Sequence, residues 1–146
     1  MRAIRSVVVM IVAVLTFGCG SPPSDIPKVE LHRVMGIVSV DGQPAKGVHV
    51  VLHPVGNTDP STVTPNGITD ETGVFKLTTY SVADGAPEGN YQLSFSWPEA
   101  SMPGAGDSDD FNEKLPPQYQ FAATSGVALE VSKNTEEMPV FELSTL

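Results

Sequence analysis

The chain has 146 residues and a formal net charge of -9, with 8 Lys and Arg against 17 Asp and Glu. A chain of this length forms one domain, or one domain with a targeting segment. The acidic balance disfavours nucleic acid as a partner, because its phosphates would be repelled. The single Cys excludes an internal disulfide framework and a Cys-rich zinc site, since each needs at least two thiols.

The first 18 residues have the composition of an export signal. Two Arg residues precede an apolar run over residues 7–15, which is too short to cross a bilayer as a helix. Gly18 and Cys19 follow directly, and this segment resembles the lipobox of bacterial lipoproteins. The resemblance implies cleavage before Cys19, acylation of its thiol with palmitate-like chains, and a membrane-held domain facing the periplasm or the outside. A plain signal peptide that leaves Cys19 as a free thiol is the alternative.

Residues 19–29 are polar and rich in Pro and show no apolar periodicity, so we expect a flexible tether there. The folded domain is expected over residues 30–146. Its apolar residues recur with period two and no window has helical spacing, which predicts an all-β fold. The expected arrangement is a two-sheet antiparallel β-sandwich of about seven short strands, with a barrel as the alternative.

The alternation also predicts which side chains form the core. The first expected strand ends at residue 41. The others cover residues 46–53, 74–80, 91–97, 127–132 and 141–143. The inward positions are Val34, Val38, Val40, Val48, Val50, Leu52, Tyr91, Leu93, Phe95, Trp97, Val127, Leu129, Val131, Phe141 and Leu143. Residues 57–66 are expected to form a loop, because two Pro residues bar a central strand. The Pro116–Pro117 pair predicts a rigid lead into a strand.

Five residues are expected to form turns. Gly42, Gly73 and Gly89 stand where the chain must reverse with positive φ, and Asp41 and Asp70 precede such glycines. A short carboxylate at these positions accepts backbone N–H groups, so the two acids are predicted to be structural.

Three blocks of sequence carry a resemblance to a known domain family. Residues 36–50, 67–77 and 85–93 place Asp-Gly, Asp-Glu-Thr-Gly and Glu-Gly-Asn turns in the order found in carboxypeptidase regulatory-like domains. The resemblance implies a transthyretin-like (prealbumin-like) β-sandwich with a non-catalytic accessory role and no transferable active site. Residues 115–119 and 124–126 are similar to a set of small envelope lipoproteins that carry this domain alone.

The sequence gives little support for an enzymatic function. His49 and His53 have the i, i+4 spacing of a helical zinc site, but on a strand that spacing separates their Cα atoms by about 13 Å. Transthyretin-like hydrolases end in a Tyr-Arg-Gly-Ser-type tail, which residues 141–146 lack. We therefore expect no enzymatic activity, with such a hydrolase as the least favoured alternative.

One acidic stretch is a candidate metal site. Asp107, Asp109, Asp110 and Glu113 lie in a segment rich in Gly and Pro, and clustered carboxylates suit Ca²⁺. A solvated loop without cofactor is the preferred interpretation, and a calcium-dependent adhesion or carbohydrate-binding module is the alternative. The sequence thus predicts a non-catalytic, lipid-anchored envelope protein that binds a protein or polysaccharide of the envelope or supports its structure.

Overall fold

The computed structural model describes residues 29–57, 62–99, 112–133 and 138–146. Within them the chain forms short strands, a 3-10 helix and one turn of α-helix. These elements are β1 (Leu31–His32), β2 (Met35–Val40), β3 (Gln43–Pro44), β4 (His49–Pro54), β5 (Asn66–Ile68), β6 (Val74–Lys76), β7 (Ala86–Pro87), β8 (Gly89–Ser96), η1 (Pro117–Gln120), α1 (Ala122–Ser125), β9 (Ala128–Val131) and β10 (Val140–Leu143). No helix in these ranges is both long and apolar enough to cross a membrane.

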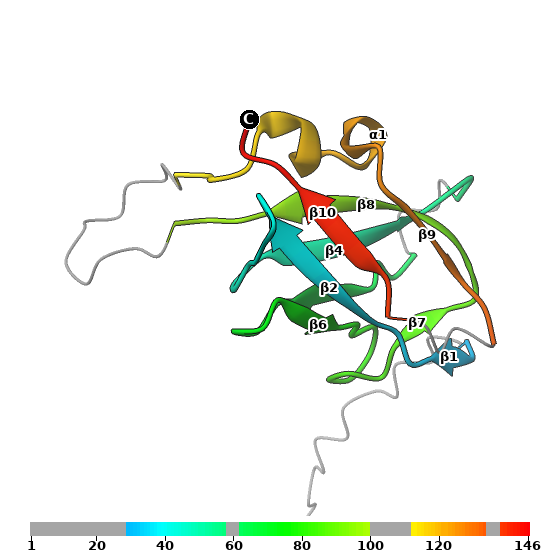
Figure 1. The fold of residues 1–146 in the computed structure, drawn as a ribbon. Helices are drawn as coiled ribbons and strands as arrows, with labels where there is room; N and C mark the ends of the chain where they lie inside the picture. Colours follow the sequence, from blue (N-terminus) through cyan, green and yellow to red (C-terminus); the bar gives the residue numbers. More distant parts are fainter. Residues whose placement is uncertain (1–28, 58–61, 100–111, 134–137) are drawn as a thin grey trace, which may run out of the picture.

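The strands form two four-stranded sheets and one small ribbon. Sheet C has the order β5-β4-β8-β9, and every neighbouring pair in it is antiparallel. In sheet B, β2 pairs with β10 along one edge and with β3 and β6 along the other. β1 and β7 pair by themselves at one end of the molecule. Figure 1 shows β10, β2 and β6 side by side in front of β4 and β8, so the predicted all-β sandwich is confirmed.

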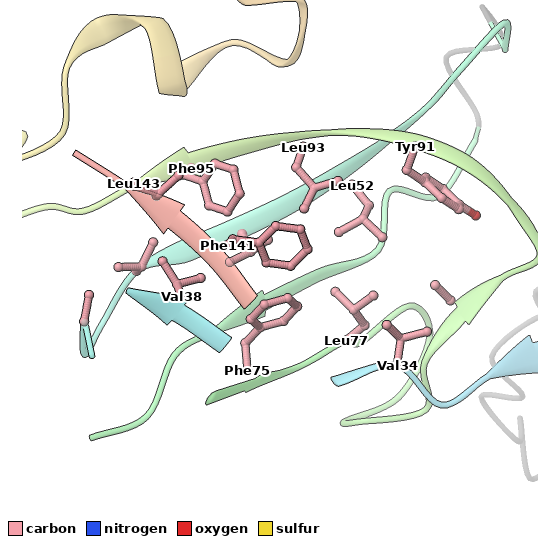
Figure 2. Close-up of a cluster of buried hydrophobic side chains, with 14 of the residues drawn as sticks. Val34, Val38, Leu52, Phe75, Leu77, Tyr91, Leu93, Phe95, Phe141 and Leu143 are labelled. Atoms are coloured by element: carbon pink, nitrogen blue, oxygen red, sulfur yellow. The ribbon is translucent and has the colours of Figure 1, made fainter. Parts of the chain in front are cut away.

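The core lies between sheets B and C. Alternate residues of each strand point into it, because successive side chains of a strand face opposite sides. Phe141 packs between Phe75 and Phe95, with ring centroids 6.0 Å from each (Figure 2). The predicted inward residues are buried, apart from Trp97, Val127 and Leu129, which are partly buried and pack against the cluster.

One strand pair departs from antiparallel order. β10 runs parallel to β2, with Val140 opposite Ile37 and Glu142 opposite Ser39. The pairing is possible because about 100 residues of chain separate the two strands, whereas a short hairpin joins only antiparallel neighbours. This register places both Phe141 and Leu143 in the core beside Val38 and Val40.

Two local expectations were wrong. The strand expected over residues 74–80 ends at Lys76, because Asp84 accepts hydrogen bonds from the N–H groups of residues 79, 80 and 81 and folds them into a turn. The Pro116–Pro117 pair leads into η1 and α1 instead of a strand. Pro117 occupies the first helical position, where its missing N–H costs nothing. The Ser125 hydroxyl then ties α1 to sheet C by a bond to the Leu93 carbonyl.

Candidate functional site

Several predicted site residues lie outside the described ranges. Cys19, the predicted lipid attachment, is one of them, as are Asp107, Asp109 and Asp110 of the predicted metal site. The described ranges contain no group of three or more His, Cys, Asp or Glu side chains arranged to hold a metal ion. His49 and His53 both lie on β4 with outward side chains, at opposite ends of the strand.

Glu113, the described member of the acidic set, serves as an internal hydrogen-bond acceptor. One of its carboxylate oxygens accepts the Trp97 N–H and, at 3.3 Å, the Leu115 N–H. The other accepts the Ser96 hydroxyl at 2.7 Å. Both oxygens thereby hold the end of β8 against the returning chain.

Asp70 and Gly73 form the turn that joins the two sheets. One oxygen of Asp70 accepts the N–H of Thr72 at 2.8 Å and of Val74 at 3.1 Å. A further hydrogen bond from the Thr72 hydroxyl is the largest cause of the lowered pKa of Asp70. Gly73 has φ +76°, and a Cβ there would lie 2.5 Å from the Val38 carbonyl oxygen. Glycine is therefore required by conformation and by space.

Asp41 has a different role from Asp70. Its backbone, at φ +50°, forms the β2–β3 turn together with Gly42, at φ +77°. Its carboxylate, however, reaches the C-terminal tail, where it accepts the Thr145 hydroxyl at 2.6 Å and the Thr145 N–H at 3.1 Å. The hydroxyl bond, followed by the N–H bond, lowers the pKa of Asp41. Asp41 thus fastens the chain after β10 to the end of β2. Gly89, at φ +156°, begins β8.

The outward side of sheet B carries the most unusual surface. Its apolar members are Met35, Ile37, Val74 and Val140, and the charged residues Lys76 and Glu142 lie beside them. We call these six residues the sheet-B outer face. Val140 is 55% exposed, and Met35 is 42% exposed. The outward side of a sandwich strand is normally polar, so this concentration of exposed apolar side chains is unusual.

The strand register arranges the sheet-B outer face in rows. Val140, Ile37 and Val74 are cross-strand neighbours and form an apolar row over three strands. Lys76 lies beside Met35 in the next row toward the start of β2. Glu142 lies beside Ser39 in the next row toward its end. The face therefore has a basic end, an apolar middle and an acidic end.

A groove of about 340 Å³ opens at the basic end. Arg33 and Lys76 contribute its positive charges, and its other lining residues are Val34, Met35, Val82 and Ala83. Ala83 has φ +57°, a conformation that costs a non-glycine residue about 1–2 kcal/mol. The Thr78 hydroxyl accepts the Ala83 N–H at 3.0 Å and holds it in place. Burial acts to raise the pKa of the adjacent Asp84, but bonds from four backbone N–H groups, its own included, outweigh it and lower that pKa.

The outward side of sheet C also carries an exposed apolar residue, Ile68 at 57%, but its polar groups are hydrogen-bonded within the domain. His53 Nε2 and the hydroxyl of Ser94 are 2.8 Å apart, and Ser96 donates to Glu113. These polar groups satisfy one another within the domain. The hydrogen-bonded His53–Ser94 pair has the contact of a nucleophile and a base, but Ser94 is only 8% exposed, so a substrate would have little access to its hydroxyl.

The sequence held a signal for the sheet-B outer face that the motif analysis missed. Met35, Ile37, Val74 and Val140 alternate with core residues, so each falls at an outward position where a polar residue was expected. Their convergence required the sheet order, because β10 lies about 100 residues from β2 in sequence.

Comparisons of the chain with protein-family models, with curated proteins and with solved structures found no match.

Proposed function

We propose that the chain is a non-catalytic, lipid-anchored protein of the cell envelope that acts through a binding surface. The observation that carries the binding role is the sheet-B outer face, where apolar side chains are exposed between a basic and an acidic end. Burying such side chains against a partner releases about 25 cal/mol for each Å² of apolar surface removed from water. The confirmed β-sandwich is compatible with the carboxypeptidase regulatory-like resemblance of residues 36–93, which implies an accessory role.

The anchor is supported by the sequence around Cys19 and by where the domain begins. β1 starts at Leu31, twelve residues after Cys19. A chain of that length reaches at most about 43 Å when fully extended, which would keep the sandwich close to the membrane. Acyl chains on Cys19 contribute about 0.8 kcal/mol for each buried methylene, and two chains give stable anchoring.

Fractionation of cells tests the anchor. The Cys19→Ser chain should move from the membrane fraction to the soluble fraction, because it cannot be acylated. Glu130→Gln serves as the matched control, since it changes an exposed residue of β9 outside the sheet-B outer face and should leave the protein in the membrane fraction. Unchanged fractionation of Cys19→Ser would refute the lipoprotein assignment.

A further inference from the structure

The charges of the sheet-B outer face are placed symmetrically about Ile37. Lys76 lies on β6, the neighbouring strand on one side of β2. Its partner on β2 is Met35, two residues before Ile37, whereas Ile37 itself pairs with Val74. Glu142 lies one strand to the other side and two residues toward the end of β2, since Ile37 pairs with Val140 and Ser39 with Glu142. Strand spacing and rise place each Cα about 8 Å from that of Ile37, in opposite directions.

This placement makes the face complementary to itself. Consider a two-fold axis that lies in the plane of the contact, passes over Ile37 and is perpendicular to the line from Lys76 to Glu142. Rotation about it brings Lys76 of a second copy over Glu142 and Glu142 of that copy over Lys76. A two-fold contact between identical surfaces repeats every interaction, so one dimer would contain two such ion pairs.

We propose that the sheet-B outer face binds the same face of a second copy of this chain, with Ile37 on the two-fold axis. The apolar rows of Val140, Ile37 and Val74 in the two copies would then cross over Ile37, so that Val140 and Val74 of each copy lie over the β2 strand of the other. The β2 strands of the two copies would cross at roughly a right angle, which is an established way for sheets to pack face to face.

The binding role in the proposed function underlies this inference, and the lipid anchor would favour it. Two anchored copies diffuse in the plane of one membrane, which raises their effective concentration above that of free copies. A dimer too weak to persist in dilute solution would form there. The structure therefore assigns Lys76 and Glu142 to specificity and the apolar row to affinity.

Exchange of the two charges is the decisive test, because both side chains are exposed and neither change disturbs the core. Lys76→Glu and Glu142→Lys should each raise the dimer dissociation constant about tenfold, since each creates two like-charge contacts. The double variant should restore the original value, because every pair is again of opposite sign. Sedimentation of the full chain carrying Cys19→Ser measures this equilibrium without the lipid. Glu130→Lys, on β9 of sheet C, is the matched control and should leave the constant unchanged.

Crosslinking in intact envelopes provides a second measurement. Ile37→Cys, treated with a short bismaleimide, should give a species of twice the chain's mass, whereas Val51→Cys, on the outward side of sheet C, should not. Val140→Cys replaces Ile37→Cys if the latter folds poorly, because Val140 is 55% exposed.

The outcomes separate this proposal from the proposed function. A monomer in both measurements, or a double variant no better than the single ones, would overturn the dimer. A crosslink to a species of another mass would assign the face to a different partner and would also overturn it. The anchor is judged independently by the fractionation of Cys19→Ser.

Discussion

The two outer sides of the sandwich follow the same alternation of residues but differ in whether their outward side chains find partners within the domain. On sheet C, His53 bonds to Ser94 and Ser96 bonds to Glu113, so the polar side chains find partners within the domain. On sheet B, exposed apolar side chains occupy the corresponding positions. The difference teaches that alternation positions a core, whereas the identity of the outward residues decides whether a face is complete or requires a partner.

The largest expected effect is a loss of stability that involves both sheets, because the turn at Gly73 joins them. Gly73→Val should lower the free energy of unfolding by about 3 kcal/mol or more, since it adds a backbone clash to a strained φ. Gly42→Val is the matched control: it has the same positive φ but no atom within 4 Å of a Cβ, and should cost about 1–2 kcal/mol. Urea denaturation measures both. Equal losses would show that the close approach to Val38 has no energetic consequence.

The next effect compares a carboxylate that is hydrogen-bonded within the domain, Glu113, with an exposed one, Glu142. Glu113→Ala should destabilise the domain by about 1–3 kcal/mol, because it leaves the Trp97 N–H and the Ser96 hydroxyl without their acceptor. Glu142→Ala, on the sheet-B outer face, should stay within about 0.5 kcal/mol of the original chain. Thermal unfolding at low protein concentration measures both variants. A neutral result for Glu113→Ala would contradict its role in closing sheet C.

Two serines give a comparison at equal burial. Ser94 on sheet C and Ser39 on sheet B are each 8% exposed and point outward. Ser94 bonds to His53, whereas among the described residues the buried Ser39 hydroxyl has no hydrogen-bond partner. Ser94→Ala should therefore cost about 1 kcal/mol, and Ser39→Ala should be neutral or stabilising. Chemical denaturation measures the free energy of unfolding of both variants. A clear loss of stability in Ser39→Ala would mean that its hydroxyl has a partner.

The smallest effect concerns the acid response of sheet B. The pKa of Asp41 is lowered in the folded chain, chiefly by the Thr145 hydroxyl. Its contribution to stability is therefore complete above the unfolded pKa, near 4, and is lost as the pH falls through the lowered folded value. Asp41→Asn keeps a residue that tolerates positive φ but removes the charge, so it should lose less stability than the original chain below pH 4. Identical acid denaturation curves would contradict this contribution.

The sequence alone determined the all-β fold and most of the core. Period-two alternation in residues 91–97 and 127–131 fixes which side chains can share a face, whatever the strand's neighbours. The turns at Gly42 and Gly73 were also predictable, because few residues other than Gly accept their φ. The shortness of β6 was not predictable, because it depends on the hydrogen bonds that the Asp84 carboxylate accepts from the backbone after β6. The helical path after Pro116 depends likewise on the bond from Ser125 to Leu93.

The sheet-B outer face was decided by tertiary structure alone. Its members come from β2, β6 and β10, and nothing local in the sequence specifies that β10 runs parallel to β2. An antiparallel β10 with the same central pair would place Glu142 beside Met35, at the same end as Lys76, and the face would lose its self-complementary charges. The direction of one strand, which the bond from Thr145 to Asp41 at the end of β2 helps to fix, thus determines where the charges of the face lie.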